Sequence, residues 1–323
     1  MESKLNTENF VTKLENMHVI NVSGEQMHEY LHGQLTASTQ PFNEEKARIS
    51  AHCDFKGKMF SVSYVSFYKD RFLLTMHKDA AAESLNQLKK YAVFSKVDIT
   101  IDQDLSCFGV AGSAHKKYVH DLFPEINNKH LSVVNNSYGQ AICFNDTTER
   151  YLLILTKSGQ EKLLSNTKEP FKNDENLWDL LEIEAGVANI QAPTLSQFVP
   201  QMINLQCLQG IDFDKGCYMG QEVVARTKFL GKNKRAAFIV KAELDSTKLS
   251  SNELVVGENI EIKVGDNWRR GGTIMRTATV TDSFQTQLFA IIVMANDTPI
   301  GSVVRLKESN QELVVQPLPY ELN

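Results

Sequence analysis

The cysteines of this chain lack any pattern that a disulfide framework or a zinc site would require. There are five of them in 323 residues, an odd number, and none stands in a Cys-x-x-Cys pair. A disulfide scaffold and a self-contained zinc site are therefore not expected. Free thiols in a reducing compartment are expected instead. We predict no metal site. The five are Cys53, Cys107, Cys143, Cys207 and Cys217.

Long apolar runs are also missing. No stretch reaches the roughly 20 apolar residues that cross a bilayer as a helix. The polar start, residues 1–6, has mixed charge and lacks the apolar core that a signal peptide requires. We therefore expect no membrane contact and a cytoplasmic protein.

An excess of positive charge is absent as well. The formal net charge is −5, so the chain has no global signature of tight binding to the phosphates of nucleic acid. A local basic patch is left open. The composition, with 42% hydrophobic and 23% charged residues, is that of an ordinary globular protein, and 323 residues indicate two or three domains.

The first two thirds of the sequence alternate between strand and helix patterns. Residues 18–22 alternate apolar and polar side chains and predict a strand, and 25–35 place Met27, Tyr30 and Leu31 on one helical face. Strand pairs separated by helices indicate an α+β protein. Further strands are expected at 48–55, 59–68, 72–76, 97–101, 107–112, 140–144 and 151–155, and further helices at 80–91, 116–122, 159–165 and 177–184.

The pattern changes after residue 232. Short strands separated by Gly, Asn and Asp follow one another with little helical periodicity, which favours a small antiparallel barrel. Such barrels occur in nucleic-acid binders, although charges on a barrel are more often simply solvated. The strands are expected at 237–241, 259–264, 270–278, 289–293 and 302–306, and a basic face could comprise Lys232, Lys234, Arg235, Arg269, Arg270 and Arg276.

The least generic stretch begins at Lys215 and reads Lys-Gly-Cys-Tyr-Met-Gly-Gln-Glu-Val-Val-Ala-Arg. A helix is expected over 219–227, so that Cys217 lies just before its N-terminus. The positive end of the helix dipole, Lys215 and Arg226 favour the thiolate of Cys217, whereas Glu222 opposes it. A structural turn with a buried, inert cysteine is the alternative.

This motif resembles the signature of the YgfZ family of folate-binding proteins, which are relatives of the aminomethyltransferase (T-protein) of the glycine cleavage system. Five further segments resemble the family in the expected order, so the resemblance covers nearly the whole chain. They are Tyr-Leu-His-Gly-Gln-Leu-Thr-Ala at 30–37, Ala-His-Cys-Asp-Phe-Lys-Gly-Lys-Met at 51–59, residues 89–97, Ile-Glu-Ala-Gly at 183–186 and Pro-Leu-Pro-Tyr at 317–320. The motif residues carried over are Lys215, Gly216, Tyr218, Gly220, Gln221, Glu222 and Arg226.

The resemblance implies an α+β fold. Two ferredoxin-like modules, one inserted in the other, would form a folate-binding body, followed by a C-terminal antiparallel β-barrel. The expected domains are 1–48 together with 107–228 for the folate-binding part that carries the motif, 49–106 for the inserted module, and 229–323 for the barrel. Folate is expected in a central cleft with Cys217, the functional thiol, at its rim.

The resemblance also assigns three folate-binding residues. Glu184 matches the carboxylate that holds the pterin ring, and a carboxylate can accept two hydrogen bonds side by side from a pterin. Trp178 matches a folate-linked tryptophan whose flat ring suits stacking. Met17 stands where the family has a second such tryptophan, and a thioether cannot stack as an indole does.

One departure from the aminomethyltransferases concerns their reaction. Those enzymes carry neighbouring aspartates a few residues after a glycine turn, and one of them is catalytic. The matching positions here hold Phe60 and Ser61, and neither can act as a carboxylate base. We therefore do not expect independent catalytic turnover by that route.

Three adjacent residues of different ligand types, His52, Cys53 and Asp54, suggest a metal or nucleophile site. Neighbouring side chains on a strand point to opposite faces, so they cannot converge on one ion, and a structural role is favoured. Lys215 and Arg226 could contact the folate glutamate tail or an RNA phosphate, and the residues leave both open.

The function that the resemblance implies is that of a tetrahydrofolate-binding accessory protein. It would support iron–sulfur enzymes, in cluster assembly or repair, and the modification of some tRNAs, with those enzymes as partners and at most a weak tRNA contact. Two alternatives stay open, a folate-dependent aminomethyl transferase and an RNA-binding module that acts through the barrel.

Overall fold

The computed structural model describes residues 9–167, 174–229, 231, 233–245, 254–281 and 285–322. The polar start at 1–6 and Lys232, both discussed above, lie outside the described residues.

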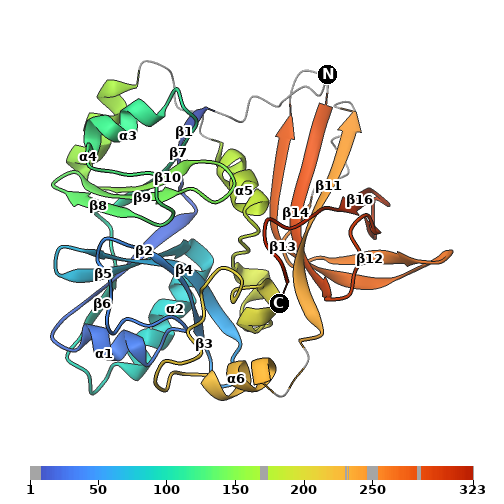
Figure 1. The fold of residues 1–323 in the computed structure, drawn as a ribbon, viewed down its shortest axis with the longest axis horizontal. Coiled ribbons are helices and arrows are strands. Elements are labelled where there is room, and N and C mark those ends of the chain that lie inside the picture. Colours follow the sequence, from blue (N-terminus) through green and yellow to red (C-terminus); the bar gives the residue numbers. More distant parts are fainter. Residues whose placement is uncertain are drawn as a thin grey trace.

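The first of two five-stranded sheets has the order β1-β7-β10-β9-β8. Its strands β1 and β7 pair antiparallel, although the whole of the second sheet is built between them in the chain. One module is therefore inserted in the other, as predicted (Figure 1). The strands are β1 (Phe10–Lys13), β7 (Ser106–Ala111), β8 (Val133–Asn136), β9 (Gly139–Phe144) and β10 (Arg150–Leu155).

The second sheet has the order β3-β4-β5-β2-β6. Strand β2 lies inside it, because Ile20 pairs with Leu74 of β5 and with Ile101 of β6. The predicted boundary between modules at residue 48 thus does not match the division of the sheets, since β2 already belongs with the inserted strands. These are β2 (Met17–Ser23), β3 (Arg48–Cys53), β4 (Met59–Tyr68), β5 (Arg71–His77) and β6 (Asp98–Ile101).

Helices cover the outer faces of these sheets (Figure 1). Helix α2 buries Ala80, Ala81 and Leu88 against the second sheet, while α3 and α4 share a separate hydrophobic cluster with the first. All ten residues of β4 are buried, because one face meets α2 and the other faces the interior of the body. The helices are α1 (Met27–His32), α2 (Lys78–Tyr91), α3 (Lys116–Leu122) and α4 (Lys157–Asn166).

A closed barrel follows, as predicted, with the strand order β11-β14-β13-β12-β15-β16. The alternation of short strands and turns located its first five strands, but it missed the last one. That strand closes the barrel by pairing Val240 with Val315. The strands are β11 (Arg235–Asp245), β12 (Asn259–Val264), β13 (Asn267–Thr281), β14 (Gln285–Ala295), β15 (Val303–Leu306) and β16 (Glu312–Val315).

Helix α5 (Glu175–Glu184) joins the barrel to the body (Figure 1). Apolar side chains of α5, β13 and β14 belong to the same hydrophobic cluster as those of both sheets. Just after α5, the hydroxyl of Tyr320 donates a hydrogen bond of 2.8 Å to the carbonyl of Gly186, so two of the segments that resemble the family meet here. The chain continues through short 3-10 turns at Ala192–Thr194 and Pro200–Ile203 to α6 (Gln221–Phe229).

His52, which belongs to the cluster of His52, Cys53 and Asp54, lies inside the protein. His52 and Cys53 are both buried, and the Nδ1 atom of His52 lies 2.8 Å from the hydroxyl of Ser84 on α2. Within the described residues, no three His, Cys, Asp or Glu side chains are placed to hold a metal ion. Burial lowers the pKa of His52 to about 3.

Because His52 is buried, the protein should lose stability in mild acid. Below its ordinary pKa of 6.5, His52 takes up a proton in the unfolded chain but not in the folded one. Lowering the pH from 7 to 5.5 should therefore cost about 1 kcal/mol of unfolding free energy through this residue. Urea unfolding of the native chain and His52→Gln at both pH values measures it. An equal pH-dependent loss in the two proteins would contradict the prediction.

Candidate functional site

A cavity of about 270 Å³ lies where the second sheet, α5 and barrel strand β13 meet. It is lined by the start of β2, the middle of β4, the end of β5 and one face of α5. The side chains that matter for its chemistry are Met17, Val62, Ser63, Tyr64, Thr75, His77, Trp178, Asp179, Glu182 and Arg276.

A second cavity of about 330 Å³ adjoins the first. The two share Ile49, Tyr64 and Val187 in their linings, so these side chains form the partition between them. The apolar ring of Phe144 lines the second cavity, and Tyr320 lines it as well. The centre of the body therefore holds two adjoining cavities, with Tyr64 on the partition between them.

Trp178 is held rigidly on the wall of the first cavity. Helix α5 begins where the side chain of Asp174 accepts the N–H of Asn176, an N-cap that sets the direction of the helix. The indole is 2% exposed and packs on β7 at Gly109, where an added Cβ would approach the ring to 2.5 Å. Trp178 therefore depends on that glycine for its position.

Three polar atoms on this lining have no hydrogen-bond partner within the described residues. They are the hydroxyl oxygens of Ser63 and Thr75 and the indole nitrogen of Trp178. A buried polar atom without a partner costs roughly 1–3 kcal/mol. Their grouping in one cavity is the pattern of a site that a polar ligand completes.

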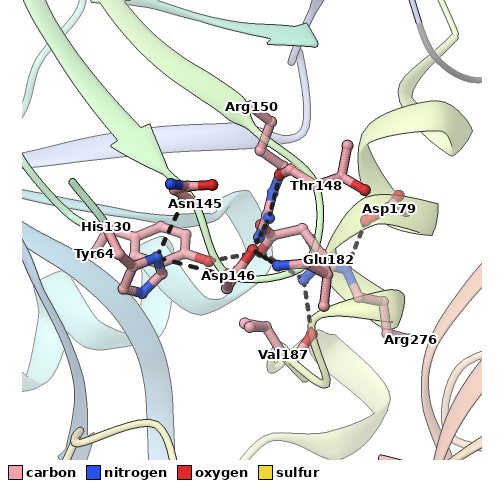
Figure 2. A network of polar contacts seen from close by, with 11 residues as sticks. Tyr64, His130, Asn145, Asp146, Thr148, Arg150, Asp179, Glu182, Val187 and Arg276 are labelled. Atoms are coloured by element: carbon pink, nitrogen blue, oxygen red, sulfur yellow. Dashed lines mark hydrogen bonds and ion pairs between the residues drawn. The ribbon is translucent and has the colours of Figure 1, made fainter. Parts of the chain in front are cut away.

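Glu182, one helical turn after Trp178, is 1% exposed and accepts hydrogen bonds from three side chains (Figure 2). One oxygen accepts from Nη2 of Arg150 at 2.9 Å. The other accepts from the hydroxyl of Tyr64 at 2.7 Å and from Nη1 of Arg276 at 3.1 Å. Burial and the carboxylate of Glu182 hold the pKa of Tyr64 well above its usual range, so this hydroxyl stays a donor.

Arg276 reaches this network from the barrel (Figure 2). Its guanidinium also donates to Asp179 at 2.7 Å and to the carbonyl of Val187 at 3.0 Å. Burial opposes its charge, but Asp179 and Glu182 outweigh that effect and raise the pKa of Arg276. Arg276 therefore does not belong to an exposed basic face of the barrel, and the sequence-based prediction was wrong there, because β13 turns this side chain toward α5.

Asp146 completes the network on the far side of Arg150. Its carboxylate accepts from Nη1 of Arg150 at 2.5 Å, and His130 stands 4.0 Å away. Burial alone would raise the pKa of Asp146, but Arg150 lowers it below the ordinary value. Burial lowers the pKa of His130, which lines the second cavity.

The structure brings two of the three predicted folate residues together. Met17 and Trp178 both line the first cavity. Glu184 is half-buried, and neither cavity as described includes it, because it lies six residues after Trp178 and two after Glu182 on the helix. Burial raises the pKa of Glu184. The carboxylates of α5 on the lining are Glu175, Asp179 and Glu182. The sequence analysis did not single out Glu182, although its spacing of four from Trp178 places both on one helical face.

The positions that replace the transferase aspartates lie away from the cavity. Phe60 packs on His52 at 5.2 Å between ring centres, and Ser61 lies 3.2 Å from the hydroxyl of Ser84. The lining of this strand starts one residue later, with Val62. The strand therefore presents an apolar side chain and two hydroxyls to the cavity, and no carboxylate.

The motif that contains Cys217 lies at a different place, outside both linings as described. Lys215 is turned into the protein, and its ammonium donates to the carbonyls of His32 at 2.6 Å, Leu35 at 2.7 Å and Ala37 at 3.2 Å. Burial lowers its pKa to about 8. Lys215 thus anchors the loop after α1.

The other motif residues shape the start of α6. Gly220 has a φ of +81°, and a Cβ there would lie 2.5 Å from the carbonyl of Asp54. Tyr218 is buried beneath the ammonium of Lys215, and Gln221 donates to the carbonyl of Lys215 at 3.5 Å. Helix α6 begins at Gln221, two residues later than predicted. The exposed members are Gly216, Cys217, Glu222 and Arg226.

The fold is that of the glycine cleavage aminomethyltransferases. The crystal structure of glycine cleavage system aminomethyltransferase T from Bartonella henselae matches with a TM-score of 0.68 and 14% identity, over 98% of this chain and 87% of that one. The family model described as YgfZ, beta-barrel domain, matches residues 233–309.

Two sequence relatives cover almost the whole chain. The tRNA-modifying proteins YgfZ of Escherichia coli O6:H1 and O127:H6 are each 36% identical over 310 residues, which is 96% of this chain and 92% of theirs. The chain belongs to the YgfZ family. No helix among the described residues is long and apolar enough to cross a membrane.

Two matched substitutions on α5 should have unequal effects on the free energy of unfolding. Glu182→Gln removes the charge that faces Arg150 and Arg276, and breaking a buried ion pair costs about 3–5 kcal/mol. Glu184→Gln, on the half-buried face of the same helix, should cost less than about 1 kcal/mol. Urea unfolding of both variants measures the difference, and equal destabilisation would mean that Glu182 has no special structural role.

Proposed function

We propose that this protein binds a folate in the cavity beside α5 and supports iron–sulfur enzymes that modify tRNA. The Escherichia coli relatives are named tRNA-modifying proteins, and the motif resemblance points to tetrahydrofolate. The observation that carries the ligand proposal is the grouping of unpartnered polar atoms around Trp178.

The residues present fit a pterin. Its flat ring carries donors and acceptors along its edge, and the hydroxyls of Ser63 and Thr75 can each donate or accept. Met17 and Trp178 supply apolar and aromatic contact. The cavity volume of about 270 Å³ is near the lower end of ligand pockets, roughly 300 Å³, and suits the ring system. The second cavity, on the other side of Tyr64, offers further space.

An accessory role suits this cavity better than aminomethyl transfer. Of the charged groups on the lining, Asp179, Glu182 and Arg276 bind one another, and Glu175 accepts the backbone N–H groups of Glu15 and Asn16. Strand β4 presents Val62 and hydroxyls, so it offers the cavity no carboxylate that could act as a base. Turnover of an aminomethylated carrier protein at about 1 per second or faster would favour the transferase instead.

Tryptophan fluorescence tests the ligand site. The chain has two tryptophans, Trp178 on the cavity and Trp268 on barrel strand β13. Tetrahydrofolate should quench the emission of the native chain and of Trp268→Phe, because both keep Trp178. Trp178→Phe should lose most of the quench. An unchanged quench in Trp178→Phe would refute this location.

The same titration identifies the pterin carboxylate. The resemblance assigns it to Glu184, and loss of charge-assisted hydrogen bonds there should weaken folate binding by at least about tenfold in Glu184→Gln, from roughly 1.5–3 kcal/mol per bond. Glu182→Gln, measured under conditions where it is folded, is the matched comparison. Native affinity in Glu184→Gln together with weak binding in Glu182→Gln would transfer the role to Glu182.

We further propose that Cys217 is the functional thiol. It is the exposed cysteine, whereas Cys53, Cys107 and Cys143 are buried and Cys207 is half-buried. Burial raises the pKa of Cys107 to about 12 and that of Cys143 to about 11. The reactive species of a thiol is the thiolate, so these buried cysteines should be inert.

Alkylation at neutral pH should therefore modify Cys217 first. Serine preserves its size but is a far weaker nucleophile and soft-metal ligand. Cys217→Ser should fold, keep the folate-induced quench and fail to restore tRNA modification in a strain that lacks the native gene. Cys207→Ser is the control and should restore it. Full rescue by Cys217→Ser would refute a chemical role for the thiol.

A further inference from the structure

Large aromatic side chains are exposed on both sides of α6. Phe55, in the turn between β3 and β4, is 68% exposed, and Phe229, at the end of α6, is 64% exposed. Figure 1 shows α6 at the lower edge of the molecule, away from the hairpin of β12 and β13. Burying either ring would release free energy, so this surface favours a partner.

Exposed and half-buried residues of three segments lie around α6. The turn that carries Phe55 packs on the start of α6, where a Cβ on Gly57 would lie 3.1 Å from Val223. At the other end of α6, the ammonium of Lys228 lies 3.7 Å from the centre of the Phe213 ring. We call this region the α6 surface, and its members are Phe55, Lys56, Lys58, Phe213, Cys217, Arg226, Lys228 and Phe229.

Cations predominate on the α6 surface. Lys56, Lys58, Arg226 and Lys228 make no ion pair within the described part of the chain, and Lys56 and Lys228 lie against the rings of Phe55 and Phe213. The carboxylates nearby in the sequence are the half-buried Asp54 and Asp212 and the exposed Asp214 and Glu222. Among the exposed charges alone, the cations Lys56, Arg226 and Lys228 outnumber the carboxylates, beside exposed aromatic rings.

We propose that the α6 surface binds a single-stranded segment of RNA, with bases on Phe55 and Phe229 and phosphates on the cations. Exposed rings interleaved with cations are how proteins hold single strands. Three of the four cations are lysines, which protein–protein interfaces tend to exclude, so a polyanion fits better than a protein partner. The choice of RNA rests on the proposed role in tRNA modification.

The same surface brings the RNA close to the thiol. An open groove is lined by Lys228, Phe213 and Gly216, the neighbour of Cys217, and by His32; the carboxylates of Asp212 and Asp214 also line it. A strand bound along α6 would therefore pass the exposed cysteine. The proposed RNA surface lies on the body of the protein and is separate from the hairpin between β12 and β13 of the barrel.

Direct binding of an unmodified tRNA transcript and of a short unstructured RNA, without folate, tests this proposal. The double variant Lys56→Glu/Lys228→Glu should bind both at least about tenfold more weakly. It should also reduce the slope of log affinity against log salt by about 1.4, or about 0.7 for each cation. Phe55→Ala/Phe229→Ala should weaken binding at least about fivefold, as expected from lost stacking.

The control is Lys263→Glu/Arg269→Glu, two exposed cations of the hairpin between β12 and β13. It should bind RNA as the native chain does. All variants should keep the folate-induced quench of Trp178, which separates failure of this proposal from failure of the ligand proposal. Absence of RNA binding at low salt would overturn the α6 surface as an RNA site. Loss in the hairpin variant alone would overturn it as well, in favour of the barrel.

Discussion

The position of the barrel on the body depends on one buried carboxylate. Glu182 lies between Arg150 of the first sheet and Arg276 of the barrel, and it also accepts the hydroxyl of Tyr64 from the second sheet. A guanidinium or a carboxylate taken from water alone would be prohibitively costly, so these groups require one another. The network therefore specifies how two sheets, one helix and the barrel meet, whatever its net contribution to stability.

The cavity is a consequence of this junction. Four elements converge on Glu182 without filling the space beside it. Of the charges on its lining, Asp179 and Glu182 bind Arg276, and Glu175 accepts backbone N–H groups. What is left for a ligand is a set of neutral polar atoms on Ser63, Thr75 and Trp178. Selectivity there would come from hydrogen-bond geometry and from the shape around the indole, since the charges are already paired.

The fold could be predicted from the sequence more completely than the site. The barrel strands and the insertion of one module in another followed from periodicity and from the resemblance. The expected domain range 1–48 includes β2, which pairs with β5 and β6 of the second sheet; the alternation of a strand indicates that it exists and says nothing about which edge it pairs with. On α5, a spacing of four from Trp178 already pointed to Glu182, whereas the resemblance directed attention to Glu184, on another face.

By itself, the sequence determined the class of protein, most of the elements and the identity of the unusual motif, because these depend on local periodicity and on residue types. Only the tertiary structure decided what each motif residue does. It turned Lys215 inward onto three carbonyls, left Cys217 exposed away from both cavities, and withdrew Arg276 from the barrel surface into a buried network. Such roles depend on contacts between residues that are far apart in the chain, up to 183 positions for Lys215 and His32. Local patterns do not record contacts of that range.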